Sequence, residues 1–172
     1  MNLSTHRFAP PLDEQKKRLA EALAQITQAL DDARAYRAAK LAGSLEQHDQ
    51  RWEALIPVIE QRKSLWVHAS TERQIRAVLA FMVEQDLKIV LVGGEDAWLI
   101  AEQLKTQQVP VVLHSSHSLP RSEDDDVDQP YKTARLLHQA GVLVALHNEG
   151  FWQQRNLPFL AGTLVAHGID PE

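Results

Sequence analysis

The chain has 172 residues, a length typical of one domain, and 44% of them are hydrophobic, so we expect a folded core. The net charge is -5 with acidic and basic residues mixed, which argues against nucleic acid as a partner. The absence of cysteine excludes disulfides, thiolate ligands and a cysteine nucleophile. No signal-peptide core and no run of about 18 apolar residues is present, so we expect a soluble protein without membrane association and leave its compartment open.

Two helices are predicted before any strand. Apolar residues recur at helical spacing from Leu19 to Leu30, which predicts a long helix over residues 13–42 that Gly43 ends. A second helical pattern runs from Leu45 to Ile59, and Pro57 should kink or end it because proline has no backbone donor. We therefore expect an N-terminal helical segment over residues 1–62.

The rest of the chain, residues 63–172, alternates between short apolar runs and helical patterns. Thr71 to Gln74 has the spacing of a capping box, which marks the start of one of these helices. Strands separated by helices need crossover connections and lie parallel, so the fold class is α/β. Four such units make a partial, half TIM-type barrel or a small open sheet. The predicted strands are 65–68, 89–92, 109–113 and 142–146, and helices are predicted from 71, over 95–104, over 131–139 and over 157–167.

Three of the four apolar runs end on histidine, at His68, His114 and His147. In parallel βα folds the functional groups gather where the strands end. Imidazole there can bind a metal or move a proton near neutral pH. A catalytic zinc site takes about three protein ligands and an open position for water, and Glu149 joins the three histidines as a candidate.

Two other motifs have weaker functional interpretations. Gly93 and Gly94 follow an apolar strand, as in phosphate-binding loops, but Glu95 and Asp96 would repel an anion and fit better as charges in the first turn of a helix. The acidic run 123–128 lacks the alternating spacing of an EF-hand loop, so we interpret it as a solvated loop.

The stretch from about Arg51 to Glu172 resembles the second half of the metal-dependent barrel of amidohydrolases, in particular the imidazolonepropionase-like group. The order and spacing of several segments carry the resemblance. The matching segments are 65–69, 88–98, 109–113, 130–131, 140–142 and 155–162. The N-terminal helices resemble the helical insertion that precedes the fifth barrel strand in this group.

The resemblance implies a deformed barrel that binds one or two divalent metals, usually zinc, and hydrolyses amide or other C–N bonds. His68 matches the fifth-strand histidine that is a metal ligand. The sixth-strand histidine position falls at Gly93, which offers no ligand. The eighth-strand aspartate, a metal ligand and proton acceptor, falls near Glu149, which is therefore the catalytic candidate. The family's first-strand histidine pair and fourth-strand lysine have no counterpart in this sequence.

The leading hypothesis is a partial amidohydrolase-like hydrolase that is inactive alone because most metal ligands are absent. His114 and His147 are its candidate substrate-binding residues for a small-molecule substrate. An isolated half-barrel leaves unpaired strand edges, so we expect a homo-oligomer or another partner that completes the barrel. Two alternatives stay open: a non-catalytic α/β interaction or oligomerisation module, and a small-molecule-binding α/β domain with an anion pocket at the strand ends.

Overall fold

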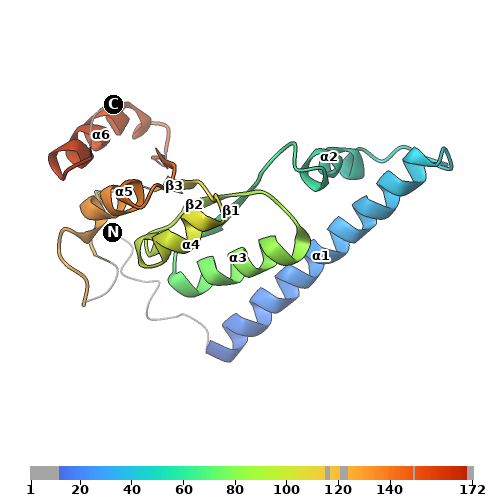
Figure 1. Cartoon of the computed structure of the whole chain (residues 1–172), viewed down its shortest axis with the longest axis horizontal. Coiled ribbons are helices and arrows are strands. Elements are labelled where there is room, and N and C mark those ends of the chain that lie inside the picture. The colour runs from blue at the N-terminus through green and yellow to red at the C-terminus, as the bar shows by residue number, and fades with distance from the viewer. Residues whose placement is uncertain (1–11, 115–116, 121–123, 149, 170–172) are drawn as a thin grey trace. The chain divides into compact units, whose positions relative to one another are not determined.

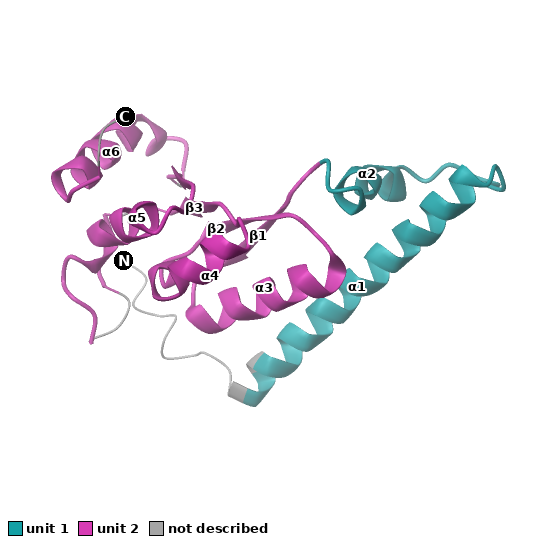
Figure 2. Ribbon diagram, viewed as in Figure 1, with its two compact units in different colours: residues 1–62 teal, residues 63–172 magenta. Residues whose placement is uncertain are grey.

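The computed structural model describes residues 12–114, 117–120, 124–148 and 150–169. Contacts between Cα atoms divide the chain into two compact units, residues 1–62 and residues 63–172 (Figure 2). No helix among the described residues is long and apolar enough to cross a membrane.

The first unit is a pair of helices. Helix α1 spans Leu12–Leu41 and helix α2 spans Gln50–Ile59. Helix α2 begins five residues later than the apolar pattern predicts, because Asp49 caps it and its side chain accepts a hydrogen bond from the amide of Arg51 at 2.9 Å. Pro57 lies inside the last turn of α2, and the helix ends at Ile59.

The second unit contains a four-stranded sheet in the order β1-β2-β3-β4, with every pair of neighbours parallel. Figure 1 labels β1, β2 and β3 together with the helices α3 to α6 of this unit. This arrangement confirms the predicted α/β class. The strands end within a residue of the predicted ends, but β3 and β4 begin two residues later than predicted. Their bounds are Leu65–Ala69 for β1, Ile89–Gly93 for β2, Val111–Leu113 for β3 and Val144–Leu146 for β4.

Helices connect and follow these strands as the sequence predicts. Thr71 and Gln74 form the predicted capping box at the start of the first of them, where the Thr71 side chain accepts from the Gln74 amide at 3.1 Å. The helix that follows β2 begins as a 3₁₀ turn. The bounds are α3 Glu72–Gln85, η1 Ala97–Ile100, α4 Ala101–Thr106, α5 Gln129–Gln139, η2 Gln154–Asn156 and α6 Leu157–Ala166.

The two faces of the sheet differ in burial. On one face, Leu91 and Val111 are fully buried together with Ile75 and Leu79 of α3, which forms the core of this unit. Side chains alternate between faces along a strand, so the next residues point the other way. We call that second face the open face; its residues within the strands are Trp66, His68, Val90, Val92, Val112 and Ala145. Trp66, His68 and Ala145 at its two edges are exposed, Val90 and Val112 are half-buried, and Val92 is buried. Trp66 is 63% exposed there, so a large apolar side chain on this face meets solvent.

Candidate functional site at the strand ends

The parallel register aligns the open face in rows that run across the four strands. His68 lies in one row with Val92, Val112 and Ala145. One step beyond the last paired residues, the next row towards the strand ends contains His114 and His147. The backbone amide of His147 donates to the carbonyl oxygen of Leu113 at 2.9 Å, which continues the β3–β4 register to this row. Two of the predicted site residues are thus brought side by side by the sheet itself.

His114 and His147 are in ring contact. Their ring centroids lie 5.7 Å apart and the ring planes meet at 46°. His114 is half-buried and His147 is exposed, so solvent reaches the pair. A substrate-binding role for either residue stays a prediction.

His68 is not part of this pair. It lies on β1, whereas His114 lies just after β3, and β2 runs between them. Neighbouring strands are about 4.8 Å apart, which separates β1 from β3 by about 10 Å across the sheet. His68 is also one row further from the strand ends and is exposed. The three strand-end histidines therefore do not converge on one point.

Gly93 occupies a position that no histidine could take without strain. Its φ is +104°, a backbone conformation that side chains rarely adopt, and an added Cβ would lie 3.0 Å from Ser70 Oγ and 3.2 Å from the carbonyl oxygen of Ala69. Gly94 is similar, because its φ is +66° and an added Cβ would lie 2.9 Å from Val111 Cγ1. The turn therefore favours glycine at both positions, and a side chain at Gly93, where the resemblance places the sixth-strand ligand, would be strained.

These residues do not fit a catalytic metal centre of the amidohydrolase kind. Such a centre takes about three protein ligands. No group of three or more His, Asp or Glu side chains that could hold a metal occurs among the described residues. Glu149, the catalytic candidate, lies outside the described residues.

A small cavity lies beside His114, at the ends of β2 and β3. Its volume is about 50 Å³, enough for a few waters and far below the size of a pocket for a drug-sized ligand. The acidic residues Glu95, Asp96 and Asp125 are among those that line it. Negative charges in the wall disfavour a phosphate or carboxylate ligand, so the geometry speaks against the anion-pocket interpretation.

Asp96 has a structural task that the sequence did not indicate. It was expected to act as a charge in the first turn of its own helix, but its side chain makes no cap hydrogen bond there. Instead, Asp96 Oδ2 accepts from the amide of Glu72 at 3.1 Å, in the first turn of α3. Asp96 thus ties the end of β2 to the start of the preceding helix.

Two residues of the acidic run pair with a lysine of helix α5. Lys132 Nζ lies 2.6 Å from Asp128 Oδ1 and 3.0 Å from Asp126 Oδ2. The hydrogen bond from Lys132 lowers the pKa of Asp128, and the two carboxylates raise the pKa of Lys132. This pairing gives two of the acidic side chains a local structural partner.

Side chains also join α6 to α5 and to the loop that precedes α5. The ring of Tyr131, on α5, stacks on that of His167 at 4.9 Å between centroids. His117 lies in the loop between β3 and α5, and its Nε2 lies 3.0 Å from Thr163 Oγ1. His117 is exposed, yet it contacts α6 through Thr163.

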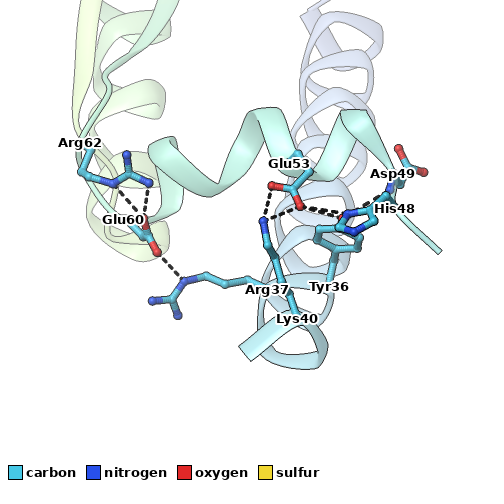
Figure 3. Close-up of polar contacts among 8 residues, drawn as sticks. All are labelled: Tyr36, Arg37, Lys40, His48, Asp49, Glu53, Glu60 and Arg62. Atoms are coloured by element: carbon cyan, nitrogen blue, oxygen red, sulfur yellow. Dashed lines mark hydrogen bonds and ion pairs between the residues drawn. The ribbon is translucent and has the colours of Figure 1, made fainter. Parts of the chain in front are cut away.

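A second polar cluster lies in the α1–α2 pair (Figure 3). Glu53 of α2 accepts from Tyr36 Oη at 2.9 Å and from Lys40 Nζ at 2.6 Å, both on α1. Glu60, the residue directly after α2, accepts from Arg37 Nε at 2.9 Å. We call these residues, with Arg62, the hairpin network. Every link except that of Arg62 to Glu60 joins α1 to α2 or to the residue that ends it.

The hairpin network shifts the pKa of its members in the direction expected for paired charges. Hydrogen bonds from Lys40 and then Tyr36 lower the pKa of Glu53, and those from Arg37 and Arg62 lower the pKa of Glu60. Burial, followed by the hydrogen bond to Glu53, raises the pKa of Tyr36. The pattern is that of an ion-pair network that joins two helices.

No protein-family model and no curated protein matches the sequence. Among solved structures, the chain is similar to an amidohydrolase from Thermotoga maritima, with a TM-score of 0.69 and 19% sequence identity. The similarity covers 88% of this chain but 40% of the other, so this chain spans well under half of that protein. At this identity the likeness concerns the fold. The chain therefore has a distant amidohydrolase-like fold, in the form of four parallel βα units.

Proposed function

We propose that residues 63–172 are one half of an amidohydrolase-like barrel, and that a second copy of the chain completes it. The observation that carries the proposal is the open face, on which Trp66 is 63% exposed. In a closed barrel this face would point inwards and be filled by side chains. The likeness to 40% of a longer amidohydrolase supports the same view.

Two copies of the chain, related by a two-fold axis along the barrel axis, would form a closed barrel. The edge strands of the sheet are β1 and β4. Rotation by half a turn sets β4 of one copy beside β1 of the other at both junctions. All strands keep the same direction, and no sheet edge remains unpaired. Four strands from each copy give the eight that such a barrel requires.

We propose further that the chain alone hydrolyses no amide or other C–N bond. The support is chemical. His68 lies on β1, apart from the histidine pair at the ends of β3 and β4. Gly93 lies where the resemblance places a histidine ligand, and a side chain there would be strained. Zinc or another divalent metal remains the expected cofactor of the hydrolase that the fold resembles, but the described residues of this chain offer it too few ligands.

The proposal is tested by purifying the full chain without added metal and measuring zinc content and amidase activity together. We expect less than stoichiometric zinc after gel filtration and no hydrolysis of simple amide substrates. Stoichiometric, tightly held zinc would contradict the proposal that the chain is catalytically incomplete.

A second candidate function is a non-catalytic assembly module, in which the same closure serves association alone. The exposed Trp66 favours it, because a large apolar side chain is placed where a partner surface would cover it. The two candidates differ in one measurable respect. Adding a polypeptide that carries the first four βα units of an amidohydrolase should produce activity only if the strand ends retain a catalytic role.

A further inference from the structure

We propose that His114 and His147 form a two-histidine site for a divalent transition-metal ion, with water in the remaining coordination positions. This site is separate from the His68 position that the amidohydrolase resemblance assigns to metal. It depends on the β3–β4 register alone, so it stands whether or not a second copy completes the barrel.

The distance between the rings fits two imidazoles on one ion. A metal–nitrogen bond of about 2.1 Å places the ion about 3.2 Å from each ring centroid, so tetrahedral ligands have centroids about 5.2 Å apart. The observed separation is 5.7 Å, and the 46° between the planes is not a stacked arrangement. The centroid separation therefore differs by about 0.5 Å from that of two imidazoles on one tetrahedral ion.

The backbone holds the two residues in place before any ion arrives. Leu113 pairs with Leu146 in the sheet, and the His147 amide donates to the Leu113 carbonyl oxygen at 2.9 Å. Two ligands on one rung of a sheet lose little freedom when they bind, which favours chelation. Among the described residues, neither imidazole has a hydrogen-bond or ion-pair partner that metal binding would have to displace.

The surroundings favour a cation. Three acidic residues, Glu95, Asp96 and Asp125, are among those that line the cavity beside His114. The whole chain carries a net charge of -5. Imidazole is a ligand for nickel, copper and zinc rather than for magnesium or calcium. With two protein ligands and water elsewhere, the ion should bind reversibly and exchange readily.

The experiment is a calorimetric titration of Ni²⁺ into the full chain, stripped of metal beforehand. We expect saturable binding of about one ion per chain, weakened about 10-fold or more in His114→Ala and in His147→Ala, since changing even an outer partner of a ligand costs about 10–100-fold in affinity. His138→Ala, which alters an exposed histidine on α5, is the matched control and should bind as the wild type does. His68→Ala distinguishes this site from the position that the resemblance assigns to metal, and it should weaken binding less than His114→Ala and His147→Ala do. Circular dichroism confirms that each variant is folded.

Three results would overturn the proposal. They are no binding to the wild-type chain, unchanged affinity in both His114→Ala and His147→Ala, and an equal loss in His68→Ala. The last result would point to a site at the fifth-strand ligand position instead. None of them bears on barrel completion, which is measured by molar mass, so failure of this inference and failure of the proposed function are distinguishable.

Discussion

The helix pair of the first unit and the strand ends of the second unit use polar residues in opposite ways. In the hairpin network, Glu53 has a tyrosine and a lysine as partners, and Glu60 has two arginines. At the strand ends, His114 and His147 contact each other and have no hydrogen-bond partner among the described residues. Charged groups with partners stabilise a structure, whereas exposed groups without partners are available to a ligand.

The difference teaches where to look for function in this chain. The hydrogen-bonded charges of the hairpin network have a structural role, because they join α1 to α2. The paired histidines have no such structural partner, because they contact each other and make no hydrogen bond among the described residues. Substitutions in the core, at the strand-end turn, in the hairpin network and at the histidine pair should therefore differ in kind as well as in size.

The largest effect is expected in the core beneath the strand ends. Leu91 is fully buried, so Leu91→Ala should lower the free energy of unfolding by about 2–5 kcal/mol through lost burial and a residual cavity. Val83, which is 62% exposed on α3, is the control. Val83→Ala should change the free energy of unfolding by less than about 0.5 kcal/mol. Urea denaturation followed by circular dichroism measures both. Equal losses of unfolding free energy in Leu91→Ala and Val83→Ala would show that the buried face of the sheet is not the core that stabilises this unit.

An attempt to restore the sixth-strand ligand should also destabilise the chain. Gly93→His forces a side chain into a left-handed backbone conformation and against Ser70 Oγ, which should cost about 1–3 kcal/mol. The variant should bind no more zinc than the wild type does. Zinc content and urea denaturation test the two parts separately. A stable variant with stoichiometric zinc would show that the turn had room for the ligand after all.

Removing charge from the hairpin network should have a smaller effect. Glu53→Gln keeps the shape of the side chain but removes the ion pair with Lys40, so the melting temperature should fall by roughly 2–4 °C. Glu46→Gln, at an exposed position between the two helices, is the matched control and should melt as the wild type does.

The same network predicts a dependence on pH. The pKa of Glu53 and that of Glu60 are lowered in the folded chain. Their contribution to stability is therefore present above the ordinary glutamate value of about 4.3 and is lost as the pH falls through the lowered values. In a melting series from pH 6 to pH 3, Glu53→Gln should lose less stability than the wild type does. Parallel curves would contradict the ion-pair account.

The smallest effect on stability is expected at the histidine pair. His147 is exposed, so His147→Ala should change the free energy of unfolding by less than about 0.5 kcal/mol. Urea denaturation in the absence of metal measures this. A loss comparable to that of Leu91→Ala would mean that the ring contact with His114 supports the sheet, and the contrast between the two regions would disappear.

The sequence predicted the elements of the fold because their signals are local. The apolar run at Ile89, the capping box at Thr71 and the helical spacing after Leu19 each act over a few residues. Strand starts were less predictable. Val109 and Val142 looked like strand residues, but their amides donate to Leu104 and Leu137, so each closes the preceding helix before the strand begins.

The candidate site was only partly predictable, because local patterns place residues at strand ends but do not say which strands are neighbours. That histidines stand at strand ends follows from their position after apolar runs. Which of them meet depends on strand order and register, and these set His114 beside His147 while β2 separates them from His68. The hairpin network was missed altogether, because Tyr36 and Glu53 are 17 residues apart and no short motif links them.

The measurement that tests the central claim most directly is the molar mass of the full chain by light scattering, over a range of concentrations. If the open face and the edges of the sheet close against a second copy, the mass should approach twice the 19.4 kDa of one chain. Trp66→Glu places a charge on the open face, so the molar mass of this variant should be that of a monomer. A wild-type chain that stays monomeric at every concentration would contradict the account.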